Sequence, residues 1–64
     1  GAVLKGANLR QAVLHGAHLE QAELTDSVLL DASLRKASLD SANLTRANLR
    51  GAVLRGADLS NANL

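Results

Sequence analysis

Leucine recurs at every fifth position of this chain, from Leu4 to Leu64, without a slip. Two residues before each leucine stands a small residue, which is alanine everywhere except at Ser27. The sequence is therefore a run of thirteen pentads of the form Ala-x-Leu-x-x, with no insertion and no linker. A repeat that covers a whole chain constrains its fold more than any single motif does. We expect one domain, residues 1–64.

A period of five fits neither an α-helix nor a flat strand. In a helix, five residues advance the pattern by about 140°, so successive leucines would scatter around the cylinder. In a strand of period two, alternate pentads would place their leucines on opposite faces. The pattern becomes consistent when each pentad is a short extended piece that is followed by a turn. A chain that turns the same way every five residues forms a coil.

The last residue of each pentad, here named the corner residue, supports this interpretation. Eight of the twelve corner residues are Gly, Asp, Ser or Asn, which are the residues that favour turns. They are Gly6, Gly16, Asp26, Asp31, Ser41, Gly51, Gly56 and Asn61.

Pentads such as Ala7-Asn8-Leu9-Arg10-Gln11 and Ala57-Asp58-Leu59-Ser60-Asn61 resemble the pentapeptide-repeat family, whose consensus is close to A(D/N)LXX. The resemblance covers the whole chain. It implies an all-β fold, a right-handed quadrilateral β-helix with four pentads per coil, and here about three coils. The small residue and the central leucine would point inward. Ser27 would then need a backbone partner for its hydroxyl, and Leu30 would be exposed.

Composition removes several classes of protein. The chain has no cysteine, so disulfides and thiolate metal sites are excluded. The formal net charge of +1 does not favour nucleic acid or an acidic membrane as a partner. There is no apolar run of 18 residues and no visible signal peptide. We expect a soluble protein, most simply a cytoplasmic one.

With residues 20 apart stacked, the charges sort by face. One face collects His15, Arg35, Lys36 and Arg55, and the next collects Glu20, Asp40 and Asp58. The first is a candidate basic face and the second a candidate acidic face for a protein partner, although a solvated surface would also explain both.

The two ends form a third candidate surface. No cap is recognisable, because ordinary repeat begins and ends the sequence, and solenoids usually need caps. We therefore expect a segment of something longer or a synthetic sequence. We also expect self-association through ends that expose leucines, namely Leu4, Leu9, Leu59 and Leu64.

No catalytic, cofactor or metal site is expected. His15, His18 and Glu20 do not converge in the repeat as zinc ligands must. The asparagines that precede a leucine are expected to cap turns through side-chain hydrogen bonds. They are Asn8, Asn43, Asn48 and Asn63.

The function indicated is a non-enzymatic, rigid scaffold that takes part in protein–protein interaction. The resemblance offers an alternative, since some members of the family mimic DNA and bind DNA gyrase. That role needs a strongly negative and longer rod, and a net charge of +1 disfavours it. A designed or consensus-derived repeat is a further alternative.

Overall fold

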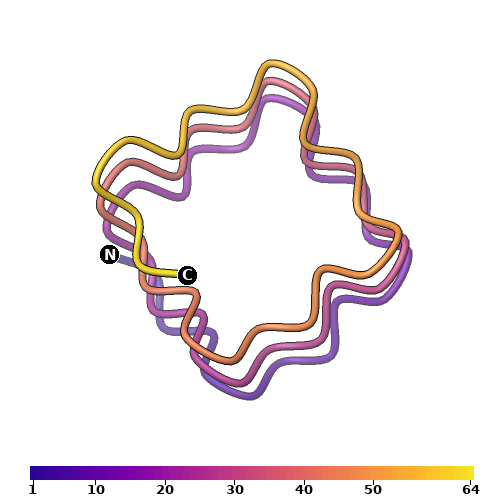
Figure 1. The fold of residues 1–64 in the computed structure, drawn as a ribbon, viewed down its shortest axis with the longest axis horizontal. Helices are drawn as coiled ribbons and strands as arrows, with labels where there is room; N and C mark the ends of the chain where they lie inside the picture. Colours follow the sequence, from indigo (N-terminus) through magenta and orange to yellow (C-terminus); the bar gives the residue numbers. More distant parts are fainter.

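The computed structural model describes all 64 residues as a four-sided coil. Viewed down its axis, successive coils lie directly above one another, and each coil has four corners (Figure 1). The molecule measures 24 × 22 × 16 Å. The shortest dimension is the coil axis, along which the chain makes about three coils, as the sequence predicts.

The coils are held in a constant register of 20 residues. The chain has no helix and no extended strand; it forms nine isolated parallel β-bridges between outward residues. These define four columns around the coil: Val3–Glu23–Asn43–Asn63, Asn8–Val28–Asn48, Val13–Ser33–Val53 and His18–Ser38–Asp58. No helix of the chain has the length and apolar character needed to cross a membrane.

The backbone pairs its polar groups in one repeating pattern. Of the 38 backbone hydrogen bonds, twelve close turns within a coil, and the others join one coil to the next. Leu24 N, for example, donates to Asn43 O of the following coil at 2.8 Å, while Ser27 N donates to Leu24 O at 3.1 Å. Each coil is thus fixed to its neighbours by backbone groups, whatever the outward side chain.

Every one of the twelve corner residues has a positive φ, between 57° and 73°. A turn with an i to i+3 hydrogen bond and a positive φ only at its third residue is a type II turn. Glycine suits that position, and Asp, Asn and Ser are tolerated there. Residues with long side chains also adopt a positive φ here, namely Gln11, Lys36 and Arg46. Each does so as a single residue and not as part of a left-handed helix.

The core is a stack of leucine and alanine. The buried residues all lie between positions 19 and 44, within and beside the middle coil. Six leucines farther from the middle coil are half-buried and pack against this core, namely Leu4, Leu9, Leu14, Leu49, Leu54 and Leu59. A residue in the middle coil is covered from both sides, whereas one in an outer coil is covered from one side only.

Two expectations about single residues are wrong. Ser27 is buried, but its Oγ has no hydrogen-bond partner, so the backbone partner that its hydroxyl needs is missing. Leu30 is half-buried rather than exposed, because in the 20-residue register it lies between Arg10 and Arg50.

Candidate interaction faces

The coil presents four faces, each built from pentads 20 residues apart. Face 1 comprises residues 2–6, 22–26, 42–46 and 62–64. Face 2 comprises residues 7–11, 27–31 and 47–51. Face 3 comprises residues 12–16, 32–36 and 52–56, and face 4 comprises residues 17–21, 37–41 and 57–61. The bridges and inter-coil hydrogen bonds fix this assignment.

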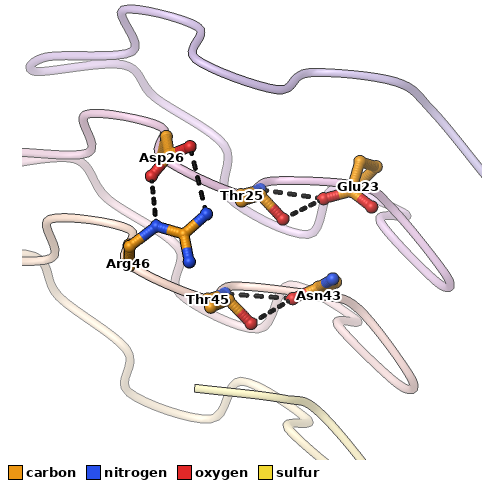
Figure 2. Close-up of polar contacts among 6 residues, drawn as sticks. All are labelled: Glu23, Thr25, Asp26, Asn43, Thr45 and Arg46. Atoms are coloured by element: carbon orange, nitrogen blue, oxygen red, sulfur yellow. Dashed lines mark hydrogen bonds and ion pairs between the residues drawn. The ribbon is translucent and has the colours of Figure 1, made fainter.

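Face 1 shows how outward side chains stabilise the turns (Figure 2). Asn43 Oδ1 accepts hydrogen bonds from Thr45 N at 3.1 Å and from Thr45 Oγ1 at 2.6 Å. One coil earlier, Glu23 Oε1 accepts from Thr25 N at 3.1 Å and from Thr25 Oγ1. The Thr25 hydroxyl and N–H hold the pKa of the Glu23 carboxyl below its usual value of 4.5. A carboxylate and an amide thus perform one structural task in equivalent positions.

The same cap recurs on other faces. Asn8 Oδ1 accepts from Arg10 N at 3.3 Å, and Asn48 Oδ1 accepts from Arg50 N at 3.1 Å. The capping role predicted for Asn8, Asn43 and Asn48 is therefore confirmed. Asn63 makes no such bond, since its N–H donor would be the residue after Leu64.

One ion pair joins two coils. Arg46 Nε donates to Asp26 Oδ1 at 2.8 Å, and Arg46 Nη2 approaches Asp26 Oδ2 at 3.4 Å (Figure 2). The hydrogen bond from Arg46 lowers the pKa of the Asp26 carboxyl. Both are corner residues, 20 positions apart. Two corner residues of opposite charge at a spacing of 20 would have predicted this ion pair from the sequence.

The candidate acidic face is face 4, and donors of the same chain engage its three carboxylates. Asp58 Oδ1 accepts from Ser60 N at 2.9 Å and from Ser60 Oγ at 2.5 Å, which lowers the pKa of Asp58. Asp40 Oδ1 accepts from Ser41 Oγ at 3.1 Å and from Asn61 Nδ2 at 3.4 Å.

The third carboxylate, Glu20, contacts a histidine. Glu20 Oε2 lies 3.3 Å from His18 Nδ1. A backbone hydrogen bond and the contact with His18 lower the pKa of Glu20. His18 and Glu20 therefore meet, contrary to expectation, because the outward position and the position after the leucine lie on one side of the chain.

The candidate basic face is face 3, where the basic side chains have no partner. His15, Arg35, Lys36 and Arg55 are all exposed, and none makes a side-chain hydrogen bond or ion pair. Val13 and Val53 lie beside them on the same face, 81% and 44% exposed. Like charges in register repel one another. Face 3 is thus the part of the surface on which an anionic partner would relieve the most repulsion.

The four end leucines do not share one environment. Leu4, Leu9 and Leu59 are half-buried against the core, while Leu64 is 71% exposed. In the last coil the N–H groups of Leu49, Leu54, Leu59 and Leu64 have no backbone acceptor among these residues.

Sequence reasoning missed the hydroxyl residues that complete the caps, namely Thr25, Thr45 and Ser60. Each follows a central leucine by one position and lies two residues after an acceptor side chain, and that spacing was available in the sequence. The surface has no pocket, and no three His, Cys, Asp or Glu side chains gather as a metal site would require.

Comparison with known proteins settles the family. The sequence matches the family described as pentapeptide repeats over residues 1–29 and 27–64. The chain belongs to the pentapeptide-repeat family. No curated protein matches it.

Solved pentapeptide-repeat structures have the same fold. One, from the Arabidopsis thaliana thylakoid lumen, superposes with a TM-score of 0.98 and is 34% identical over all of this chain. HetL of the cyanobacterium Nostoc, involved in heterocyst differentiation regulation, superposes with a TM-score of 0.67 and is 39% identical over 98% of this chain. Rfr23 of the cyanobacterium Cyanothece superposes with a TM-score of 0.65 and is 34% identical over 97% of this chain. The predicted right-handed quadrilateral β-helix is thus confirmed.

This pentapeptide-repeat chain is shorter than these relatives. It spans 44% of the Arabidopsis chain, 32% of HetL and 46% of Rfr23.

Proposed function

We propose that this pentapeptide-repeat chain is a non-enzymatic scaffold that binds a protein partner through face 3. The observation that carries the proposal is the contrast between faces 3 and 4. The carboxylates of face 4 already accept hydrogen bonds from the same chain, whereas the cations of face 3 have none.

The shape supports binding rather than catalysis. Catalysis usually needs a cavity in which an acid, a base or a nucleophile meets substrate. Here the interior is packed with leucine and alanine, and the outer carboxylates Glu23 and Asp58 hold turns. The backbone bonds between coils keep the faces rigid, so a partner would bind at a low cost in ordering.

A regulatory scaffold is consistent with one relative. HetL is involved in heterocyst differentiation regulation. We do not carry that role over, but a solenoid whose faces dock other proteins is a fold-level basis for regulation of this kind. The DNA-mimic alternative receives no support from a net charge of +1 or from an uncompensated basic face.

The test uses the chain as bait with a matched pair of variants. Arg35→Glu with Arg55→Glu reverses the charge of face 3, while Arg10→Glu with Arg50→Glu makes the same change in net charge on face 2. We expect proteins that crosslink to the wild-type chain to be lost with the first variant and retained with the second. Retention of the same proteins by both variants would contradict the proposal.

The ends are a second candidate surface, and the hydrogen-bond pattern favours it. The last coil offers unpaired leucine N–H groups, and the first coil offers carbonyl groups of the type that accept such N–H groups elsewhere in the stack. A further stretch of repeat or a second copy would fit this edge in register. Replacing Leu64 with Lys should weaken association through this edge, measured as the concentration dependence of the melting temperature. No change in that dependence would exclude the end as a contact.

A further inference from the structure

The basic and acidic columns occupy the same position of the repeat. The position after the central leucine carries His15, Arg35 and Arg55 on face 3, and Glu20, Asp40 and Ser60 on face 4. Because one backbone register runs through the whole coil, both columns have the same axial spacing, about 4.8 Å per coil. A second copy of this chain therefore presents the Asp40 carboxylate opposite Arg35. Both hydrogen bonds of Asp40 within its own chain are made by Oδ1, so Oδ2 is left to accept from Arg35 of the other copy.

We propose that face 3 of one copy binds face 4 of another, with the coil axes parallel. This inference rests on the proposed function, because it names the partner of the same basic face. His15 and Glu20 are one pentad apart, as are Arg35 and Asp40. One pentad is a quarter of a coil, or about 1.2 Å of rise. Copies related by rotation without axial shift thus bring Arg35 of one copy and Asp40 of the next to nearly the same level.

The four-sided shape determines how many copies associate. Faces 3 and 4 are consecutive sides of a four-sided coil (Figure 1), and because four pentads complete one coil, consecutive faces are related by a quarter turn. Joining face 3 to face 4 rotates each copy by a quarter turn relative to the last. A heterologous contact with that rotation closes after four copies. The proposed assembly is a ring of four with one rotation axis.

The corner between faces 3 and 4 would lie nearest the centre of that ring. It is formed by Gly16, Lys36 and Gly56. The two glycines have no side chain to hinder close approach, whereas Lys36 of four copies would meet around the axis. Arg35 and Lys36 are adjacent cations, yet the ring predicts opposite effects for them. Removing Arg35 should weaken the ring, and removing Lys36 should strengthen it.

The contact area between two copies determines how strongly they are expected to associate. With dimensions of 24 × 22 × 16 Å, one face offers roughly 350 Å² per copy, so a single pair buries less than the ~1,200 Å² of a standard stable interface. Each copy in the closed ring uses two faces, so closure adds contacts. We expect assembly at high protein concentration and low ionic strength, and its loss in salt that screens exposed charges.

Sedimentation at increasing concentration of the 64-residue chain, in low and in high salt, tests the ring. We expect a monomer and a four-copy species at low salt, and monomer alone at high salt. Lys36→Ala should raise the association constant, and Arg35→Ala should lower it about tenfold. Circular dichroism of the same samples verifies that each variant has the wild-type fold.

A reciprocal charge exchange gives the sharpest form of the test. Arg35→Glu with Arg55→Glu should not assemble alone, nor should Glu20→Lys with Asp40→Lys, but an equal mixture should restore the four-copy species. Arg10→Glu with Arg50→Glu, which changes net charge equally, should assemble as the wild type does. A monomer under every condition, or a weakening by Lys36→Ala as large as that by Arg35→Ala, would overturn the ring. Neither result would affect the crosslinking test of the proposed function, which is scored on other proteins.

Discussion

The middle coil, residues 22–41, and the two outer coils are built from one repeat but differ in burial and in their corners. The middle coil contains seven of the ten buried leucines and alanines, and the other three, Leu19, Ala42 and Leu44, lie next to it, whereas the rest of the outer coils are covered on one side only. All four corner glycines lie in the outer coils, at Gly6, Gly16, Gly51 and Gly56.

All four corners of the middle coil carry a side chain in the left-handed region, at Asp26, Asp31, Lys36 and Ser41. Each outer coil has two such corners, Gln11 and Gln21 in the first and Arg46 and Asn61 in the last. A residue with a side chain costs roughly 1–2 kcal/mol there. In this fold, cover from both sides thus stabilises a coil enough to offset twice as many strained corners.

The first prediction compares one column of the core. Leu14, Leu34 and Leu54 occupy equivalent positions in successive coils, and only Leu34 is fully buried. Leu34→Ala should lower the free energy of unfolding by about 2–5 kcal/mol, because it leaves a cavity that neighbouring coils cannot fill. Leu14→Ala and Leu54→Ala should each cost about half as much. Urea unfolding of the three variants makes the comparison, and equal costs would refute it.

The second prediction concerns the one imperfect inward site. Ser27 Oγ is buried without a partner, where every other pentad has alanine. Ser27→Ala should raise the free energy of unfolding by about 1–2 kcal/mol, since an unsatisfied buried hydroxyl is costly. Ser33→Ala, at an outward half-buried position, serves as the control and should change stability by less than about 0.5 kcal/mol. A loss of stability in Ser27→Ala would mean that the hydroxyl has a partner.

The third prediction exchanges corners between coils. Gly16, Lys36 and Gly56 form one column, all with positive φ. Lys36→Gly should stabilise the chain by about 0.5–1 kcal/mol, because relief of the left-handed conformation exceeds the added freedom of glycine in the unfolded chain. Gly16→Lys should destabilise the chain by a similar amount. No atom lies near the position of the added Cβ, so the loss comes from the backbone conformation and not from a steric clash. Thermal melts of both variants measure the effects, and shifts of the same sign would contradict the account.

The fourth prediction concerns pH. The pKa values of Glu23, Asp26 and Asp58 are all lowered in the fold by hydrogen bonds to the carboxylate. A lowered pKa gives stability that is fully present above the unfolded value and is lost as the pH falls through the folded value. The melting temperature should therefore be level near neutral pH and decrease below about pH 4.5.

Glu23→Gln provides the control for that profile. Its amide oxygen can still accept hydrogen bonds from Thr25, as Asn43 accepts them from Thr45 in the next coil. The variant should keep most of the neutral-pH stability and lose part of the decrease in acid. An unchanged acid profile would show that the Glu23 cap does not contribute to it.

The strict five-residue period was enough to predict a coil with inward leucines, because few other structures fit that period. The 20-residue register was predicted only from the resemblance to the pentapeptide-repeat family. The sequence also predicted the caps at Asn8, Asn43 and Asn48, since a short amide before a turn has one convenient donor. It did not reveal that Ser27 would lack a partner, which depends on where its hydroxyl lies relative to the neighbouring carbonyl oxygens. The contacts between Asp26 and Arg46 and between His18 and Glu20 depend on side-chain conformations, which the repeat alone does not determine.

The difference between the coils is tested most directly by residue-resolved amide hydrogen exchange. The N–H groups of Leu24, Leu29, Leu34 and Leu39 donate to the next coil and are covered on both sides. They should exchange most slowly, with protection close to that of global unfolding. Those of Leu49, Leu54 and Leu59 have no acceptor among these residues and should exchange fastest. Uniform protection along the chain, or greater protection in the outer coils, would contradict the account.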